Sequence, residues 1–304
     1  MLIVKGKEGW VWVLLEPLRI IHNNKLVFFS IASFTTLPLS FLLFTLSTPP
    51  HPLRNHIYHL EALARFTSTL MEARHVSHES RDNAVYLLRI RSFFYLLCLP
   101  LSLAAAVSSV YTTHTTLQGK TLTLTSALNA VRNNWKRPFI TVIFVYVILM
   151  AFSPVPRVIA TLFFSHETRF LIMAIGSAFE VYLMAVMGLG LVVSIVEDRF
   201  GWDAICVGSG LMKGKRLIFG WVLSSLFVFI SGIINGRVEL LLEGLNSKIS
   251  VSNLMLLICS YGFTVIFSYV VTTVFYFDSR IRHDFREPET HEENDDCISL
   301  SSSL

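Results

Sequence analysis

The chain has 304 residues, of which 53% are hydrophobic and 15% charged, and its mean hydropathy is +0.59. Because a soluble domain carries about 25% charged residues, this composition excludes an ordinary soluble protein and indicates that lipid is the main solvent. The net charge of +4 is too small to favour nucleic-acid binding. The basic residues lie mostly beside apolar runs, where they orient helices and contact anionic headgroups.

The first 25 residues predict a segment that lies on the membrane surface. A short apolar stretch, Trp10–Leu15, is interrupted by Glu16 and Pro17. No small-residue cleavage pattern of a signal peptide follows, so we expect the first long apolar run to remain as a span. Residues 9–21 favour an interfacial helix whose tryptophans lie at headgroup level.

Six long apolar runs predict an all-α, polytopic membrane domain that covers residues 26–278. Each run has about 20 residues or more, enough for a helix to cross a hydrocarbon core of about 30 Å. The runs are 26–46, 92–111, 138–164, 170–196, 217–235 and 254–277. They leave room for short loops but not for a soluble catalytic domain, so we expect neither enzyme activity nor a cofactor.

The long loop over 47–91 holds five of the ten histidines. His56 and His59 are three residues apart, as are His75 and His78, and such pairs on helices could bind zinc. A solvated or headgroup-facing histidine cluster is the simpler interpretation. We therefore expect no metal site.

The third run contains Pro154 and Pro156, which remove backbone hydrogen bonds and kink a helix. Two interpretations compete. Either the span ends near Pro154 and an interfacial turn follows, or one bent helix continues to Phe164. The first interpretation is favoured, and the number of spans is the same in both.

Three amphipathic, basic segments precede spans and indicate an internal repeat. They cover residues 17–25, 126–137 and 202–216. A shift of 77 residues aligns Ala127 with Ala204 and places the second and third spans on the fourth and fifth. The pattern favours three units, each an interfacial helix followed by a hairpin of two spans.

Glu180 is the one acid deep inside a run, about ten residues into the fourth span. A charge at that depth is costly, so Glu180 is a candidate for cation binding or for a proton relay. The alternative is a neutral carboxyl group, or one hydrogen-bonded to Ser224, Ser225 or Thr264 on a neighbouring helix. This structural interpretation is favoured over the functional one.

Small residues in the fourth and fifth spans mark faces on which helices pack. They are Ala174, Ala178, Gly188, Gly190, Gly220 and Ser224. Small side chains let helices approach closely. Packing within the chain is favoured over a dimer face or a substrate path.

The stretch from Val193 to Arg216, together with the exit of the last span, resembles a known family. The matching residues are Val193, Glu197, Gly201, Ala204, Leu211, Lys213 and Gly214, and then Tyr276, Asp278, Arg280 and Arg282. These positions are similar to those of plant uncharacterised six-pass transmembrane proteins. They also resemble, more distantly, bacterial integral membrane proteins related to the membrane domain of glycerophosphodiester phosphodiesterases. The resemblance implies a six-helix membrane domain with interfacial helices, and it carries over no activity because the phosphodiesterase barrel is absent.

The same two stretches have an architectural interpretation. Glu197 and Asp198 stand where an amphipathic helix is expected to begin, and acids favour a helix N-terminus. The basic residues at its end are expected to pair with Asp278 and its neighbours. We expect contacts with headgroups, or with these neighbours, from Lys136, Arg137, Lys213, Lys215, Arg216, Arg280 and Arg282.

Loop charges predict the orientation of the chain. The side that holds both termini carries fifteen Lys and Arg residues and the opposite side ten. The positive-inside rule therefore favours cytoplasmic termini. The tail over 279–304 is acidic and then serine-rich, and we expect it to be disordered.

The sequence favours a non-enzymatic protein of an endomembrane (ER or Golgi) or of the plasma membrane. Its partners would be membrane lipids, with proteins docking at the cytoplasmic face. The alternative is a small-solute or ion transporter that uses Glu180. No pattern in the sequence identifies a substrate.

Overall fold

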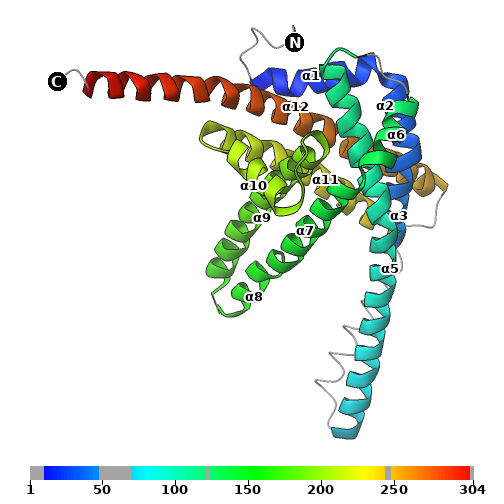
Figure 1. Ribbon diagram of the computed structural model, residues 1–304. Coiled ribbons are helices and arrows are strands. Elements are labelled where there is room, and N and C mark those ends of the chain that lie inside the picture. Colours follow the sequence, from blue (N-terminus) through cyan, green and yellow to red (C-terminus); the bar gives the residue numbers. More distant parts are fainter. Residues whose placement is uncertain (1–9, 48–69, 121–123, 164, 244–247, 302–304) are drawn as a thin grey trace. The chain divides into compact units, whose positions relative to one another are not determined.

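The computed structural model describes residues 10–47, 70–120, 124–163, 165–243 and 248–301. Every regular element in these ranges is a helix, which confirms the all-α prediction (Figure 1). The helices are α1 (Trp10–Asn23), α2 (Lys25–Ile31), η1 (Ala32–Thr36), α3 (Leu37–Ser47), α5 (Leu70–Leu117), α6 (Leu124–Asn134), α7 (Lys136–Phe152), α8 (Val155–Thr161), α9 (His166–Val196), α10 (Gly201–Leu211), α11 (Lys215–Glu243) and α12 (Lys248–Ser301). Of the histidine pairs in the long loop, His56 and His59 lie outside the described residues.

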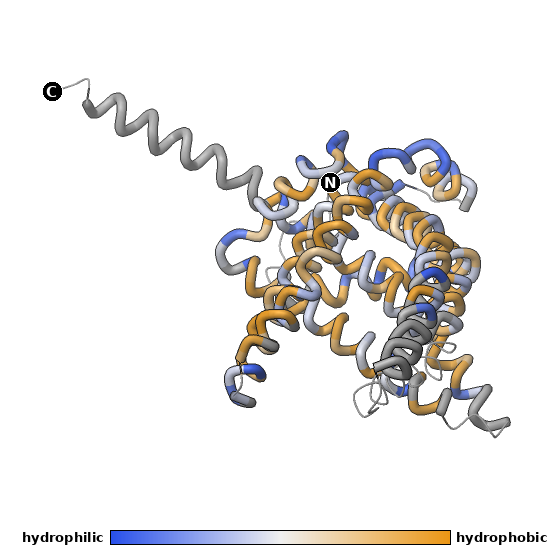
Figure 2. Tube along the Cα trace, turned by 90° about the horizontal axis from the view of Figure 1, so that it is seen from below, coloured by the Kyte–Doolittle hydropathy of each residue, from blue (hydrophilic) through white to orange (hydrophobic). Residues whose placement is uncertain are grey.

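Five of the described helical segments are long and apolar enough to cross a membrane. They are Lys25–Thr45, Ser92–Leu117, Glu167–Val196, Arg216–Val238 and Ser252–Ile281. A sixth span is counted if α6 and α7, which meet at a bend of 67°, are taken together. Figure 2 shows that these helices are hydrophobic over most of their length and that hydrophilic residues gather near their ends. The chain is therefore an integral membrane protein.

The third predicted span breaks where its prolines stand. Helix α7 ends at Phe152, and Pro154 is the N-cap of the short helix α8. With 17 residues, α7 is about 26 Å long at 1.5 Å per residue, close to the thickness of the hydrocarbon core. Helix α8 then leads into α9, so the continuous bent helix to Phe164 is not formed.

The helices divide into two compact units, which are described separately. One unit contains residues 1–30, 106–230 and 266–304, and the other contains residues 31–105 and 231–265. The first unit holds α1, α6 to α10, and the adjoining parts of α2, α5, α11 and α12. It contains all the polar contacts on which the functional argument depends.

The core of the first unit is built from β-branched and leucine side chains of α9 and α12. Leu189, Val192 and Val193 are at most 2% exposed, and so are Val270 and Val274. Their spacing of three and four residues places them on one face of each helix. Burial of these faces brings Glu197, after the end of α9, close to Arg280 near the end of the apolar span in α12.

Two glycines let α10 lie directly against α9. A Cβ atom on Gly208 would lie 2.8 Å from the backbone nitrogen of Gly190, and one on Gly190 would lie 3.0 Å from the Cα of Ile205. No side chain fits in this crossing. The short helix is therefore fixed on the span that precedes it (Figure 1).

The second unit contains a π-helical turn, Ala32–Thr36, within the first span. Thr36 and Ser40 are fully buried, and a Cβ atom on Gly262 would lie 3.2 Å from the Ser40 Oγ. Phe44 packs edge-on against Tyr261, with ring centroids 5.3 Å apart. Small and hydroxyl side chains thus permit close helix packing here, as they do in many membrane proteins.

The three-unit plan stays a prediction, and the order of the described helices is compatible with it. The short helices α1, α6 and α10 each stand directly before the helices of a span. The two alanines aligned by the 77-residue shift, Ala127 on α6 and Ala204 on α10, are both fully buried. The last helix differs from expectation, because α12 continues to Ser301 through the tail for which disorder was predicted.

Candidate functional site

Glu197 ends α9 instead of beginning the next helix. It is the C-cap of α9, and its backbone N–H donates to the carbonyl oxygen of Val193 at 2.7 Å. Helix α10 begins at Gly201, whose φ of +61° turns the chain and whose N–H donates to the Thr141 Oγ1 at 2.9 Å. The expectation that Glu197 and Asp198 stand at the N-terminus of the amphipathic helix is therefore wrong. Helix α10 begins instead at Gly201, four residues after Glu197, where the left-handed conformation of the glycine turns the chain.

The Glu197 carboxylate is the centre of a polar network. The hydroxyl group of Tyr276 donates to its Oε1 at 2.5 Å, and the Nε of Arg280 lies 3.6 Å from the same oxygen. The Nε of Arg199 lies 3.7 Å from the other oxygen, Oε2. The side chain of Glu197 is only 18% exposed, so one hydrogen bond and two ion pairs take the place of most of its hydration.

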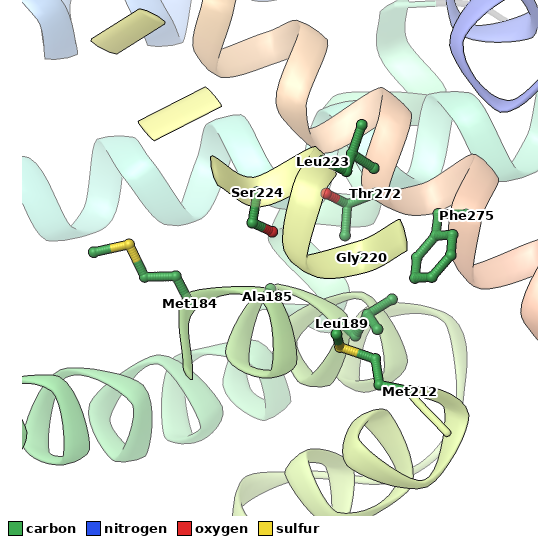
Figure 3. Close-up of a pocket in the computed structure, with 10 residues that line it drawn as sticks. Met184, Ala185, Leu189, Met212, Gly220, Leu223, Ser224, Thr272 and Phe275 are labelled. Atoms are coloured by element: carbon green, nitrogen blue, oxygen red, sulfur yellow. The ribbon is translucent and has the colours of Figure 1, made fainter. Parts of the chain in front are cut away.

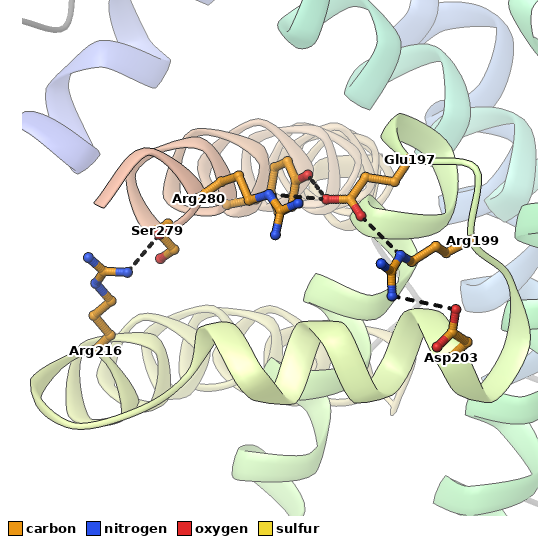
Figure 4. A network of polar contacts seen from close by, with 7 residues as sticks. Glu197, Arg199, Asp203, Arg216, Ser279 and Arg280 are labelled. Atoms are coloured by element: carbon orange, nitrogen blue, oxygen red, sulfur yellow. Dashed lines mark hydrogen bonds and ion pairs between the residues drawn. The ribbon is translucent and has the colours of Figure 1, made fainter. Parts of the chain in front are cut away.

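Two further contacts extend this network along α10 and α11 (Figure 4). Arg199 also reaches Asp203 in the first turn of α10, with its guanidinium 3.7 Å from the carboxylate. Arg216, in the first turn of α11, donates to the carbonyl oxygen of Ser279 on α12 at 2.7 Å. We call the set Glu197, Arg199, Asp203, Arg216, Tyr276, Ser279 and Arg280 the Glu197 network.

A separate ion pair joins α7 to the segment between α9 and α10. Arg137, in the first turn of α7, pairs with Asp198, and both side chains are well exposed. Exposed pairs of this kind contribute between 0 and about 1 kcal/mol. The pair fixes the direction of the two side chains more than it stabilises the fold.

The network unites the two stretches that the sequence analysis singled out. Glu197 comes from the first stretch, and Tyr276 and Arg280 come from the second. The two stretches are therefore in contact, but through other partners than those expected. Arg280 pairs with Glu197, and Arg216 binds the backbone carbonyl of Ser279. Tyr276 belonged to the quoted pattern, yet nothing in its spacing indicated that it would bind Glu197.

The predicted basic residues divide into two groups. Arg137, Arg216 and Arg280 make the internal contacts described above. Lys136 and Lys213 are exposed, and neither forms a hydrogen bond or an ion pair with any residue that the structure describes. The side chains of Lys215 and Arg282 lie outside the described part of the chain.

Glu180 lies near the middle of α9, about 21 Å along the helix from His166 at 1.5 Å per residue. Its side chain is half-buried and makes no hydrogen bond or ion pair within the described ranges. Of the partners expected for it, Ser225 donates instead to the carbonyl oxygen of Val222 at 2.8 Å.

Among the predicted small residues, Ala178 lies where α9 meets α11, whereas Gly190 faces α10 and Ala174 is exposed. The indole N–H of Trp221 donates to the carbonyl oxygen of Ala178 at 2.9 Å. A Cβ atom on Gly220 would lie 2.8 Å from the Cε of Met212. Trp221 was not singled out from the sequence. The signal that could have drawn attention to it is its place inside an apolar run, next to Gly220.

A small cavity lies between α9, α11 and α12 (Figure 3). Its volume is about 30 Å³, close to the space of one water molecule. Its lining includes Gly188, Gly220 and Ser224, and also Thr272 and Phe275. Glu180 is not among the lining residues, so this cavity does not supply the polar site that a transport role for Glu180 would require.

Metal ligands do not gather in the described part of the chain. No group of three or more His, Cys, Asp or Glu residues there has a geometry that could hold a metal ion.

The sequence profile of one protein family, "Domain of unknown function (DUF8558)", matches residues 9–286. The chain therefore belongs to this family, and the match includes every residue of the Glu197 network. No curated protein matches the chain. No solved structure matches it either.

Proposed function

We propose that this member of the DUF8558 family is a non-enzymatic membrane protein that organises lipids or docks partner proteins at one face of the membrane. The Glu197 network is the observation that carries the proposal. Its carboxylate accepts a hydrogen bond from Tyr276 and is paired with Arg199 and Arg280, so its charge is balanced within the protein. The chemistry gathered at this site serves to hold helix ends together.

The position of the network supports this role. Arg216 begins the apolar span of α11, Glu197 follows the last residue of the span in α9, and Arg280 is next to the end of the span in α12. A fixed arrangement of these ends presents the short helix α10, to which Asp203 belongs, in a defined position at the membrane edge. Rigid surface helices are what docking or lipid organisation requires.

We place this face in the cytoplasm, because the loops on this side carry fifteen of the 25 Lys and Arg residues. The membrane would be an endomembrane of the ER or Golgi, or the plasma membrane. Similarity to plant six-pass proteins, and more distantly to bacterial membrane domains of the phosphodiesterase type, fits the same plan of spans and interfacial helices.

A second candidate, transport of an ion or a small solute, is favoured by one observation. Glu180 is a carboxyl group in the middle of a span, without a partner among the described residues. Such a group marks a transport path by default. The organising role requires instead that the group be dispensable.

Flux across proteoliposomes separates the two functions. The purified wild-type protein is compared with Glu180→Gln and with Glu167→Gln, a matched control in the exposed first turn of α9. We expect no flux of a panel of ions and solutes, while an added ionophore confirms that the vesicles are sealed. Flux that is lost in Glu180→Gln and kept in Glu167→Gln would overturn the organising role and establish transport.

A further inference from the structure

We propose that Lys136 and Lys213 bind the headgroups of anionic phospholipids, whereas the arginines beside them hold the protein's own structure. The inference rests on the proposed function, because it names the partner of an organising membrane protein. It divides a set of basic residues that are indistinguishable in the sequence.

The three acids between the end of α9 and the first turn of α10 are already paired with arginines. Glu197 is paired with Arg280 and Arg199, Arg199 also pairs with Asp203, and Asp198 is paired with Arg137. None of these carboxylates is left to balance an additional cation. The two lysines therefore contribute uncompensated positive charge to this edge of the protein.

Both lysines are exposed and stand at a boundary between a short helix and a span. Lys136 is the first residue of α7, and Lys213 lies between α10 and α11. Arg137, next to Lys136, pairs with Asp198 after α9, and the Glu197 network joins the end of α9 to the first turn of α11, next to Lys213, so the two lysines lie at the same edge of the helices. A lysine that stands next to the end of an apolar span can extend its side chain to the level of the lipid phosphates.

Apolar side chains on the same short helices favour a lipid surface over a soluble acidic protein. Leu128 on α6 is 52% exposed and Trp202 on α10 is 60% exposed, and Trp135, between α6 and α7, is 43% exposed. Each short helix also buries a residue in the protein, Ala127 on α6 and Ala204 on α10. A helix with one face in the protein, exposed leucine or tryptophan on another, and lysine at its end fits the headgroup region of a bilayer.

The test is lipid selectivity measured by electron spin resonance. The full-length protein is reconstituted in phosphatidylcholine vesicles that contain either spin-labelled phosphatidylserine or spin-labelled phosphatidylcholine, and the fraction of each lipid immobilised at the protein is measured. Lys136→Gln/Lys213→Gln is compared with Arg137→Gln/Asp198→Asn, a double variant at the same edge that removes a pair without changing the net charge. Circular dichroism and gel filtration confirm that both variants are folded.

We expect the wild type to prefer phosphatidylserine, and the preference to fall by up to about fivefold for each lysine replaced. The Arg137→Gln/Asp198→Asn protein should keep the wild-type preference, and Lys136→Arg/Lys213→Arg should restore it. Added salt should weaken the preference in the wild type more than in the lysine variant. A wild type without preference, or a preference that survives Lys136→Gln/Lys213→Gln, would overturn the inference.

The outcome is distinguishable from that of the proposed function. Vesicles that show no flux and no lipid preference would leave a docking role for proteins and remove the lipid-binding role. Vesicles with Glu180-dependent flux and a lysine-dependent lipid preference would remove the organising role and keep the lipid site.

Discussion

Replacement of Glu197 by glutamine tests whether the network holds the end of α9 to the end of the apolar span in α12. The amide oxygen can still accept a hydrogen bond from Tyr276, but the negative charge that attracts Arg199 and Arg280 is lost. The Glu197→Gln variant keeps the size of the side chain. It therefore isolates the electrostatic contribution from that of packing.

The magnitude follows from the exposure of each partner. The Arg199 and Arg280 side chains are 48% and 41% exposed, so solvent screening leaves each ion pair about 0.5 kcal/mol. Tyr276 is 2% exposed, and a hydrogen bond to a charged acceptor is worth about 1 kcal/mol more than one to a neutral acceptor. We expect Glu197→Gln to lower the free energy of unfolding by about 2 kcal/mol in total.

The assay is reversible unfolding in mixed micelles with increasing sodium dodecyl sulfate, followed by circular dichroism. A double-mutant cycle adds Tyr276→Phe, which removes only the hydroxyl group. We expect Tyr276→Phe to cost about 1 kcal/mol less in the Glu197→Gln protein than in the wild type, because the two residues interact directly. The exposed Asp198→Asn change serves as the control and should stay within about 0.5 kcal/mol of the wild type.

Equal costs of Tyr276→Phe in both backgrounds would show that the two side chains are not coupled. That result would refute the assignment of the network as the contact that joins α9 to α12. A large effect of Asp198→Asn would refute the argument from exposure.

Two further changes test the packing of the first unit. Gly208→Ala should lower the free energy of unfolding in the same micelle assay by about 2 kcal/mol or more, because the added Cβ atom would meet the Gly190 backbone. Gly210→Ala, on the same helix, is the control. Its Cβ atom meets nothing within 4 Å, so this change should be neutral or slightly stabilising. Equal effects of the two alanines would contradict the close crossing. Trp221→Phe should lower the free energy of unfolding by about 1 kcal/mol, because the hydrogen bond to the Ala178 carbonyl is lost. Infrared or solid-state NMR spectra of a carbonyl label at Ala178 should report the release of this oxygen. An unchanged spectrum would show that the indole does not bind the Ala178 carbonyl.

The sequence by itself determined the spans. The length of an apolar run must match the thickness of a bilayer, and this is a property of the chain alone. Five runs therefore coincide with described helices long enough to cross a membrane. The prolines after Phe152 likewise determined where the third span breaks, because Pro154 cannot donate the backbone hydrogen bond that would continue α7.

Only the tertiary structure decided which charges meet. Glu197 lies 79 residues from Tyr276 along the chain, and no local pattern couples the two. The sequence offered several cations at the same membrane edge, and each was a plausible partner by charge. Helix crossing at Gly190 and Gly208, together with the turn at Gly201, positions the ends of α9 and α10 and hence the contacts of Glu197.

The same reason separates the arginines from the lysines. A guanidinium group that reaches a carboxylate or a carbonyl oxygen, as Arg280 and Arg216 do, has a partner within the protein, whereas Lys136 and Lys213 have none among the described residues. Both kinds of residue carry one positive charge and lie next to an apolar span in the sequence. The difference depends on distances across the packed helices, which arise only when the spans assemble.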